Sequence, residues 1–197
     1  MKEGLCSAIS FLKGNAQVLR AGSTEWEDAA LNLPLVEGDE LTTAAGTRLE
    51  IQFDSLTYVR MDESSDLRIV TLRDEGIALS LPQGTIGFRL NEFDINKAYF
   101  EVDAPGSTIA AQQSGSYRID AGQQGDNEIR VNVADSGEAR IYSKDLGFLL
   151  KDGRSARIVI SGSNSGESNI SGADLYADNF GEWMLERDDV VSRSVQA

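Results

Sequence analysis

The feature that most constrains this chain is a series of short alternating segments, punctuated by glycine, that begins at Gly38 and continues to about residue 160. In the segment TRLEIQF, from Thr47 to Phe53, every second residue is apolar. This two-residue period is typical of a strand with one face against a core. The residues expected to face the core are Leu49, Ile51 and Phe53, and those expected to face away are Arg48, Glu50 and Gln52. The pattern predicts an all-β fold of short strands.

Composition limits the partners of this fold. The 197 residues include 18 basic and 32 acidic side chains, for a formal net charge of -14, and 41% of the residues are hydrophobic. A core of useful size is therefore expected, as one domain with a tail. The negative charge repels phosphate backbones and anionic lipid headgroups, so nucleic acid and the membrane surface are poor partners.

Residue types needed for common catalytic sites are missing. The chain has no histidine, which removes the usual general base and the commonest metal ligand. Cys6 is the single cysteine, so neither an internal disulfide nor a multi-cysteine zinc site can form. We therefore expect no enzymatic activity, no catalytic residues, no metal ligands and no cofactor.

Chemical motifs that remain have simpler explanations as turns. Asp135-Ser136-Gly137 has the form of an aspartic protease motif but lies between two strand-like segments, where we expect a hairpin turn. The acidic residues Asp62, Glu63 and Asp66 could pair for glycosidic cleavage or bind calcium, yet a solvated loop carries the same residues. Residues 120–128 are rich in oxygen ligands without the spacing of an EF-hand.

Four arginines lie on predicted strands. They could line one face as a groove for an anion or a glycan, although solvent-facing positions of half-buried strands are the commoner explanation. They are Arg89, Arg118, Arg140 and Arg157.

The first strands and an internal similarity suggest how the chain turns. Ala8–Leu12 and Ala16–Leu19 are separated by Lys13-Gly14-Asn15, which predicts a hairpin, and Pro34 disfavours a central strand at its position. A glycine followed closely by a basic and an aliphatic residue then recurs at irregular spacing. The recurrences start at Gly46, Gly115, Gly137 and Gly153. They indicate either a degenerate β-roll or only the repeated chemistry of a turn that enters a strand.

The composition changes after Ile160. Residues 161–173 are small and polar, which predicts a linker or a surface loop, and the β domain is expected to occupy residues 1–160. Residues 174–197 are expected to form a C-terminal helical segment, with the helix from about Asp174 to Asp189. Its aromatic stripe of Tyr176, Phe180 and Trp183 is a candidate partner-binding face, and docking of the stripe onto the chain's own β domain is the commoner outcome.

Taken in order, several segments resemble the FecR domain family over roughly residues 12 to 160. The most specific are Gly38-Asp39-Glu40-Leu41 with Thr43, the segment from Phe100 to Gly106, and Gly115-Ser116-Tyr117-Arg118-Ile119. The resemblance implies an extracytoplasmic all-β module, here a β-roll, β-helical or sandwich-like domain followed by a short helix. Because turn residues make up most of the shared pattern, it specifies a fold more than an activity.

The family suggests two roles. Its best-known members resemble periplasmic regulators that relay a signal from an outer-membrane receptor to a sigma factor, and they carry a cytoplasmic segment and a transmembrane helix. Others are stand-alone envelope proteins with a following Trp and Arg-Asp segment, which Trp183 and Glu186-Arg187-Asp188 resemble. We therefore expect a periplasmic or otherwise extracytoplasmic protein whose signal peptide has been removed.

From these observations the first hypothesis is a non-enzymatic binding module of the bacterial cell envelope, with an envelope protein or cell-wall glycan as its partner. The second is a sensory or regulatory domain of a transmembrane signalling protein. The third is a carboxylate-dependent, glycan-active enzyme, which needs two acids facing each other across a cleft.

Overall fold

The computed structural model describes residues 5–54, 56–122, 127–144, 147–160, 168–172 and 174–196. These residues form seventeen strands and one helix, α1 (Asn179–Val195). The strands of the first half are β1 (Ser7–Lys13), β2 (Ala16–Leu19), β3 (Trp26–Asp28), β4 (Pro34–Leu35), β5 (Glu40–Thr43), β6 (Arg48–Phe53), β7 (Thr57–Met61), β8 (Asp66–Arg73) and β9 (Gly76–Asp94). Those of the second half are β10 (Tyr99–Ala104), β11 (Ser107–Ala111), β12 (Gln113–Ala121), β13 (Glu128–Ala134), β14 (Glu138–Tyr142), β15 (Gly147–Lys151), β16 (Arg154–Val159) and β17 (Ser168–Gly172).

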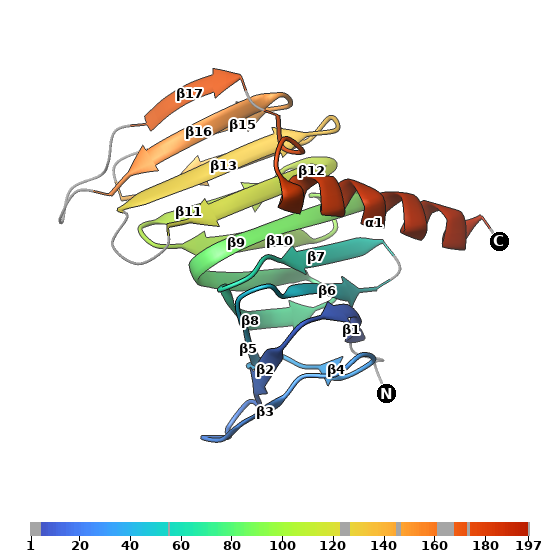
Figure 1. Ribbon diagram of the computed structural model, residues 1–197. Coiled ribbons are helices and arrows are strands. Elements are labelled where there is room, and N and C mark those ends of the chain that lie inside the picture. Colours follow the sequence, from blue (N-terminus) through green and yellow to red (C-terminus); the bar gives the residue numbers. More distant parts are fainter. Residues whose placement is uncertain are drawn as a thin grey trace.

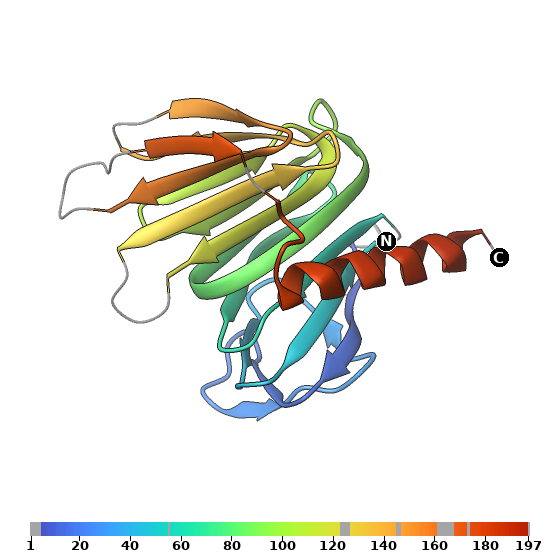
Figure 2. The same ribbon diagram turned by 45° about the horizontal axis from the view of Figure 1, so that its top comes forward.

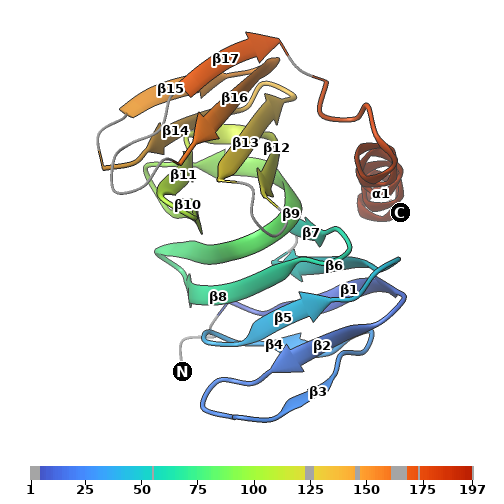
Figure 3. The ribbon, with the colours of Figure 1, turned by 60° about the vertical axis from the view of Figure 1, so that its left-hand side comes forward.

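The strands form two facing sheets that share the long strand β9. Sheet A has the order β4-β1-β6-β7-β9-β12-β13-β16-β17. Sheet B has the order β3-β2-β5-β8-β9-β10-β11-β14-β15. Along both sheets the chain advances from one end to the other, from blue to orange in Figures 1 and 3. The prediction of an all-β domain with a C-terminal helix is confirmed.

Successive hairpins are added to the two sheets in turn. The hairpin of β10 and β11 belongs to sheet B, that of β12 and β13 to sheet A, that of β14 and β15 to sheet B, and that of β16 and β17 to sheet A. The recurring glycines lie at or beside points where the chain passes between sheets; they are Gly46, Gly115, Gly137 and Gly153. The internal similarity thus marks the crossings of a β-roll whose strands are antiparallel except for the parallel pair β9 and β10.

Two turns predicted as hairpins are corrected by this topology. Lys13-Gly14-Asn15 joins β1 to β2, but β1 pairs with β4 and β6 whereas β2 pairs with β3 and β5. Asp135-Ser136-Gly137 likewise joins β13 of sheet A to β14 of sheet B. The sequence of a turn between two alternating segments is the same whether the second strand pairs with the first or joins the opposite sheet. The local pattern therefore does not distinguish a hairpin from a crossing between sheets.

Strand β9 passes from sheet B to sheet A at a bend near Pro82 and Gly84. Residues before the bend pair with β8 and β10, and residues after it pair with β7 and β12. Gly84 has a φ of 97°, and a Cβ there would lie 2.3 Å from Ser65 Oγ. Both observations require glycine at this position.

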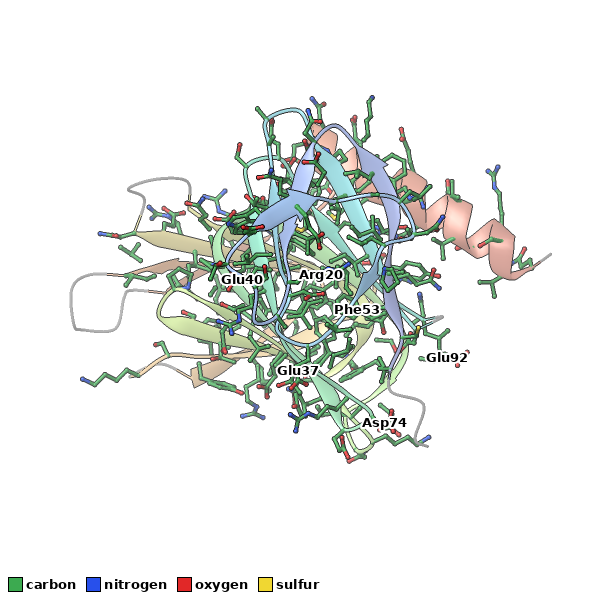
Figure 4. The ribbon with its side chains drawn as sticks, turned by 90° about the horizontal axis from the view of Figure 1, so that it is seen from below. Arg20, Glu37, Glu40, Phe53, Asp74 and Glu92 are labelled. Atoms are coloured by element: carbon green, nitrogen blue, oxygen red, sulfur yellow. The ribbon has the colours of Figure 1, made fainter. Side chains whose placement is uncertain are left out.

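The main hydrophobic core lies between the sheets. Leu49, Ile51 and Phe53 are fully buried there, as the alternation predicted. Figure 4, which looks along the roll from below, shows Phe53 among the ribbons, while Asp74 and Glu92 project at the periphery. Pro34 lies in the two-residue edge strand β4, which agrees with its expected exclusion from a central strand.

The C-terminal segment differs from its prediction in two respects. Ser168–Gly172, inside the expected linker, is strand β17 and pairs with β16, while residues 161–167 and 173 lie outside the described part of the chain. The helix runs from Asn179 to Val195 rather than from about Asp174 to Asp189. The carboxylate of Asp174 accepts a hydrogen bond from the Tyr176 N–H, which forms a turn before the helix. The carboxylate of Asp178 accepts one from the Gly181 N–H, which makes Asp178 the N-cap of α1.

No helix in the described ranges has the length and apolar character to cross a membrane.

Candidate interaction surface

The outer face of sheet A carries helix α1 (Figure 2). Across the sheet, the contacts of α1 and its N-cap extend from β12 over β9 and β7 to β6 and β1. A small apolar cluster of Leu175, Phe180 and Met184 lies at this interface, separate from the main core. The rest of the contact is made by charged and aromatic side chains, which is unusual for a helix packed on a sheet.

An ionic network lies beneath the helix. Glu50 and Arg60 are paired neighbours on β6 and β7, and although both point outward they are 0% and 2% exposed because α1 covers them. Arg60 Nε donates to Glu50 Oε2 at 2.9 Å, and Arg60 Nη1 donates to Asp188 Oδ1 at 2.7 Å and to the Met184 carbonyl at 3.1 Å. Arg187 donates to both oxygens of Glu50, at 2.9 and 3.2 Å. We call Glu50, Arg60, Arg187 and Asp188 the latch network.

Aromatic rings and guanidinium groups pack around the latch network. Arg48 and Arg118 both lie over the ring of Phe180, with their guanidinium carbons 5.4 and 5.3 Å from its centroid. The ring centroids of Trp183 and Phe11 are 5.4 Å apart. Cation–π contacts of this kind stabilise most where they are shielded from water, as at Phe180, which is 1% exposed.

The segment before the helix is held by one further ion pair and one hydrogen bond. Arg118 donates from Nη1 and Nη2 to the two oxygens of Asp178, at 2.6 and 2.7 Å, so the N-cap of α1 is attached to β12. The hydroxyl of Tyr176 donates to Asp135, whose carboxylate also pairs with Arg89 at 3.0 Å. Attachment at both ends of the interface fixes the position of α1 along the sheet.

The predicted aromatic stripe is therefore used inside the molecule. Phe180 is buried, Trp183 packs on Phe11, and Tyr176 bonds to Asp135. Of the two alternatives for this stripe, the structure shows docking onto the chain's own β domain. A partner could reach Phe180 only if α1 moved.

The other candidate residues are mostly engaged in structural contacts. Asp62 pairs with Arg48, Glu63 accepts from the N–H of Gly46, and Asp66 accepts from Thr42. Within the described ranges no group of three metal-ligating side chains is close enough to hold an ion. Of the segment 120–128, residues 123–126 lie outside the described part of the chain.

The four predicted arginines do not form one groove. Arg140 lies on sheet B, and Arg89 is paired beneath the segment that leads to α1. Arg118 and Arg157 do line one open groove of about 760 Å³ on sheet A. Arg118 is bound there to Asp120 and Asp178, and Arg157 to Glu128. Because these cations are already paired, the groove offers little unbalanced positive charge to an anion.

Residues 39–138 match the model of a protein family described as FecR protein. The chain belongs to the FecR family. The matched region runs from just before β5 to the start of β14 and so includes strands of both sheets. The resemblance found in the sequence is thereby confirmed.

Two crystal structures share the FecR chain's fold, each of a proposed anti-sigma factor from Parabacteroides distasonis ATCC 8503, at 2.50 and 1.65 Å resolution. Their TM-scores are 0.57 and 0.59, both at 15% sequence identity, and the alignments cover 68% and 74% of this chain. They cover 60% and 64% of the other chains, so this chain spans less than two thirds of either. No curated protein sequence matches it.

The motif that carries the FecR resemblance is structural in this chain. Asp39 is fully buried and accepts hydrogen bonds from Arg20 and from the N–H groups of Ala21 and Val36. Thr43 Oγ1 donates to the Asp62 carbonyl at 2.6 Å. The motif thus orders loops around β5 and contributes no reactive group.

Sequence reasoning missed the latch network. The alternation predicts that Glu50 faces away from the core, which is correct, but it does not predict that α1 buries this position together with Arg60 on the neighbouring strand. A signal was present in the helix. Arg187 follows Phe180 and Trp183 at helical spacing, and Arg187 and Asp188 are opposite in charge to Glu50 and Arg60, respectively.

Acid should release α1. Burial by itself raises the pKa of Glu50, but the hydrogen bonds from Arg187 and the charge of Arg60 outweigh it, so the pKa lies below its ordinary value of 4.5. A lowered carboxyl pKa stabilises the docked state above the ordinary pKa, and this stabilisation is lost as the pH falls through the lowered value. We expect hydrogen exchange of α1 to accelerate, relative to that of the core strands, as the pH drops below about 4.5. A Glu50→Gln variant whose acid profile matched that of the wild type would contradict this assignment.

A single glycine makes room for the helix. Gly87 on β9 faces Met184, and a Cβ at Gly87 would lie 1.9 Å from its Sδ. Alanine is tolerable there because the end of Met184 can move, whereas leucine overpacks the interface at a cost of about 1–3 kcal/mol. Gly87→Leu should therefore increase opening of α1 about 10-fold to 100-fold by hydrogen exchange and leave protection of the core strands unchanged. Gly147→Leu, at a glycine with open space around it, is the matched control.

Proposed function

We propose that this chain is a regulatory domain of a signalling system in the bacterial cell envelope and that it acts by binding another protein. The observation that carries the proposal is the FecR match over residues 39–138. FecR proteins are regulatory rather than enzymatic, and they are typically associated with the envelope. The similar structures described as proposed anti-sigma factors add support for a signalling role.

The geometry suggests where regulation takes place. Buried ion pairs contribute little net stability because desolvation offsets their attraction, but they specify one arrangement. The latch network fits that description, and among the described residues the buried Nη2 of Arg60 has no hydrogen-bond partner. An α1 held by such contacts can be released at moderate cost, so we propose that the partner acts on α1 or on the face of sheet A beneath it.

The test compares gene expression with partner capture in the native host. The coding sequence is deleted and complemented with the full wild-type chain, with Gly87→Leu, or with the control Gly147→Leu. A regulatory domain predicts that a defined set of transcripts changes on deletion, that wild type and Gly147→Leu restore it, and that Gly87→Leu does not. Cross-linking in the same strains should capture a membrane-bound regulator with wild type and less of it with Gly87→Leu.

A second function is a stand-alone binding module of the envelope. The observation that favours it is the docked segment containing Trp183 and Arg187-Asp188, which resembles the segment that follows stand-alone FecR domains. Unchanged transcripts together with a captured envelope protein would select this function over regulation. Unchanged transcripts with no captured protein would reject both.

A further inference from the structure

A second surface, unrelated to α1, lies on the outer face of sheet B near the β2–β5 end of the roll. A hollow of about 320 Å³ opens there between β3, β5, β8 and β9. The side chains relevant to binding are Trp26, Glu40, Thr42, Asp66, Arg68 and Ser80. Figure 4 views the molecule from this end and labels Glu40. The volume lies at the lower end of the range for ligand sites.

Strand register places these residues in two rows across the sheet. In one row Trp26 and Glu40 are both opposite Leu19, Glu40 is opposite Arg68, and Arg68 is opposite Ser80. In the adjacent row Thr42 is opposite Asp66. With strands about 4.8 Å apart, the first row covers about 19 Å from β3 to β9. The hollow is thus an elongated polar strip with an indole at one end.

The indole of Trp26 is available to a ligand. Its residue is 43% exposed and lies on the three-residue edge strand β3. The other tryptophan, Trp183, packs against Phe11 and Phe180 instead. A large exposed aromatic beside polar groups is typical of a binding site, because the ring offers flat apolar contact at low entropic cost.

The polar groups of the strip retain capacity for hydrogen bonds. Glu40 and Arg68 approach only to 3.7 Å, and their side chains are 37% and 55% exposed. Thr42 Oγ1 donates to Asp66 Oδ1 at 2.6 Å, which leaves the remaining lone pairs of that carboxylate open. Carboxylate acceptors and guanidinium donors therefore lie side by side within reach of one ligand.

The combination of these groups selects a ligand class. The strip has two carboxylates and one guanidinium, so its negative charge disfavours an anionic ligand. Its charged side chains also disfavour a purely apolar ligand. A sugar ring has an apolar C–H face that stacks on indole and hydroxyl groups that both donate and accept hydrogen bonds. We propose that this strip of sheet B binds a neutral oligosaccharide, with Trp26 as the stacking platform and Glu40, Asp66 and Arg68 as the hydroxyl partners. The site goes beyond the proposed regulatory function and does not depend on it.

The experiment is a titration of the full ¹⁵N-labelled chain with chitotetraose, cellotetraose and maltotetraose, followed by ¹H–¹⁵N spectra. The two indole N–H signals are assigned with Trp26→Phe. At least one sugar should shift the Trp26 signal saturably in the millimolar range or below, while the Trp183 signal stays in place. Trp26→Ala should weaken binding at least about tenfold, and Arg68→Ala and Glu40→Gln several-fold.

Two controls distinguish binding at this site from non-specific binding to exposed aromatic residues and from the effects of misfolding. Tyr142→Ala removes another exposed aromatic of sheet B, 36% exposed on β14, and should bind like the wild type. Dispersed backbone spectra establish that each variant is folded before its affinity is compared. No saturable shift with any of the three sugars, or equal affinity for Trp26→Ala and wild type, overturns the proposal.

Discussion

Replacing Glu50 by alanine is expected to release α1 from sheet A while the β-roll stays folded. The substitution removes the buried carboxylate that pairs with Arg60, which then keeps only the contact to Asp188 on the helix, and it deprives Arg187 of both its hydrogen bonds to Glu50. Breaking a buried ion pair by removing one partner costs about 3–5 kcal/mol, and the molecule can avoid that cost by letting α1 leave, which hydrates Arg60. Opening of α1 should therefore increase at least about 100-fold by hydrogen exchange.

The matched control is Gln52→Ala, an outward residue two positions along the same strand and outside the latch network. It should leave α1 protected. Glu50→Leu combined with Arg60→Leu removes both buried charges and should recover part of the protection that Glu50→Ala loses. Unchanged exchange of α1 in Glu50→Ala would show that the network does not hold the helix.

Asp39→Ala should be the most damaging substitution within the turn that begins at Gly38. The buried carboxylate accepts three hydrogen bonds, at 2.9 to 3.0 Å, from Arg20, Ala21 and Val36. Two backbone N–H groups lose their acceptor, and hydrogen bonds to a charged group contribute about 1.5–3 kcal/mol each. We expect a loss of roughly 3 kcal/mol or more in the free energy of unfolding, measured in urea, and a fall in Tm of about 6–12 °C.

Two further variants test the cause of that loss. Asp39→Asn keeps the shape of the side chain but replaces one acceptor oxygen by an NH₂ group, which cannot accept a hydrogen bond from the facing N–H donors. It should therefore be nearly as destabilising as Asp39→Ala. Glu37→Ala, two positions away, removes a surface ion pair with Arg73 and one hydrogen bond from the Leu72 N–H, and it should destabilise the fold much less than Asp39→Ala. A mild effect of Asp39→Ala would mean that water or a neighbouring group replaces the carboxylate.

The strands themselves were predictable because their signal is local. A two-residue period requires only that one face meets an apolar environment, and Leu49, Ile51 and Phe53 satisfy it inside the roll. The C-terminal helix was predictable for a similar reason, although its start was not. Asp174 and Asp178 hydrogen-bond to nearby N–H groups, and that competition with the helix is not visible in a hydrophobic period.

Which sheet each strand joins was not predictable. The turns at Lys13-Gly14-Asn15 and at Asp135-Ser136-Gly137 have hairpin residues, yet both carry the chain across to the opposite sheet. Pairing depends on contacts between strands distant in the chain, which a turn of three residues does not encode.

By itself, then, the sequence determined the strand faces, the all-β class, the amphipathic C-terminal helix and membership of the FecR family. Tertiary structure alone decided that the outward residues Glu50 and Arg60 are buried, since the elements covering them lie more than a hundred residues away, at Arg187 and Asp188. The alternation of apolar and polar residues along a strand indicates on which side of the sheet each residue lies. Whether that side meets water is decided by the element that packs on it.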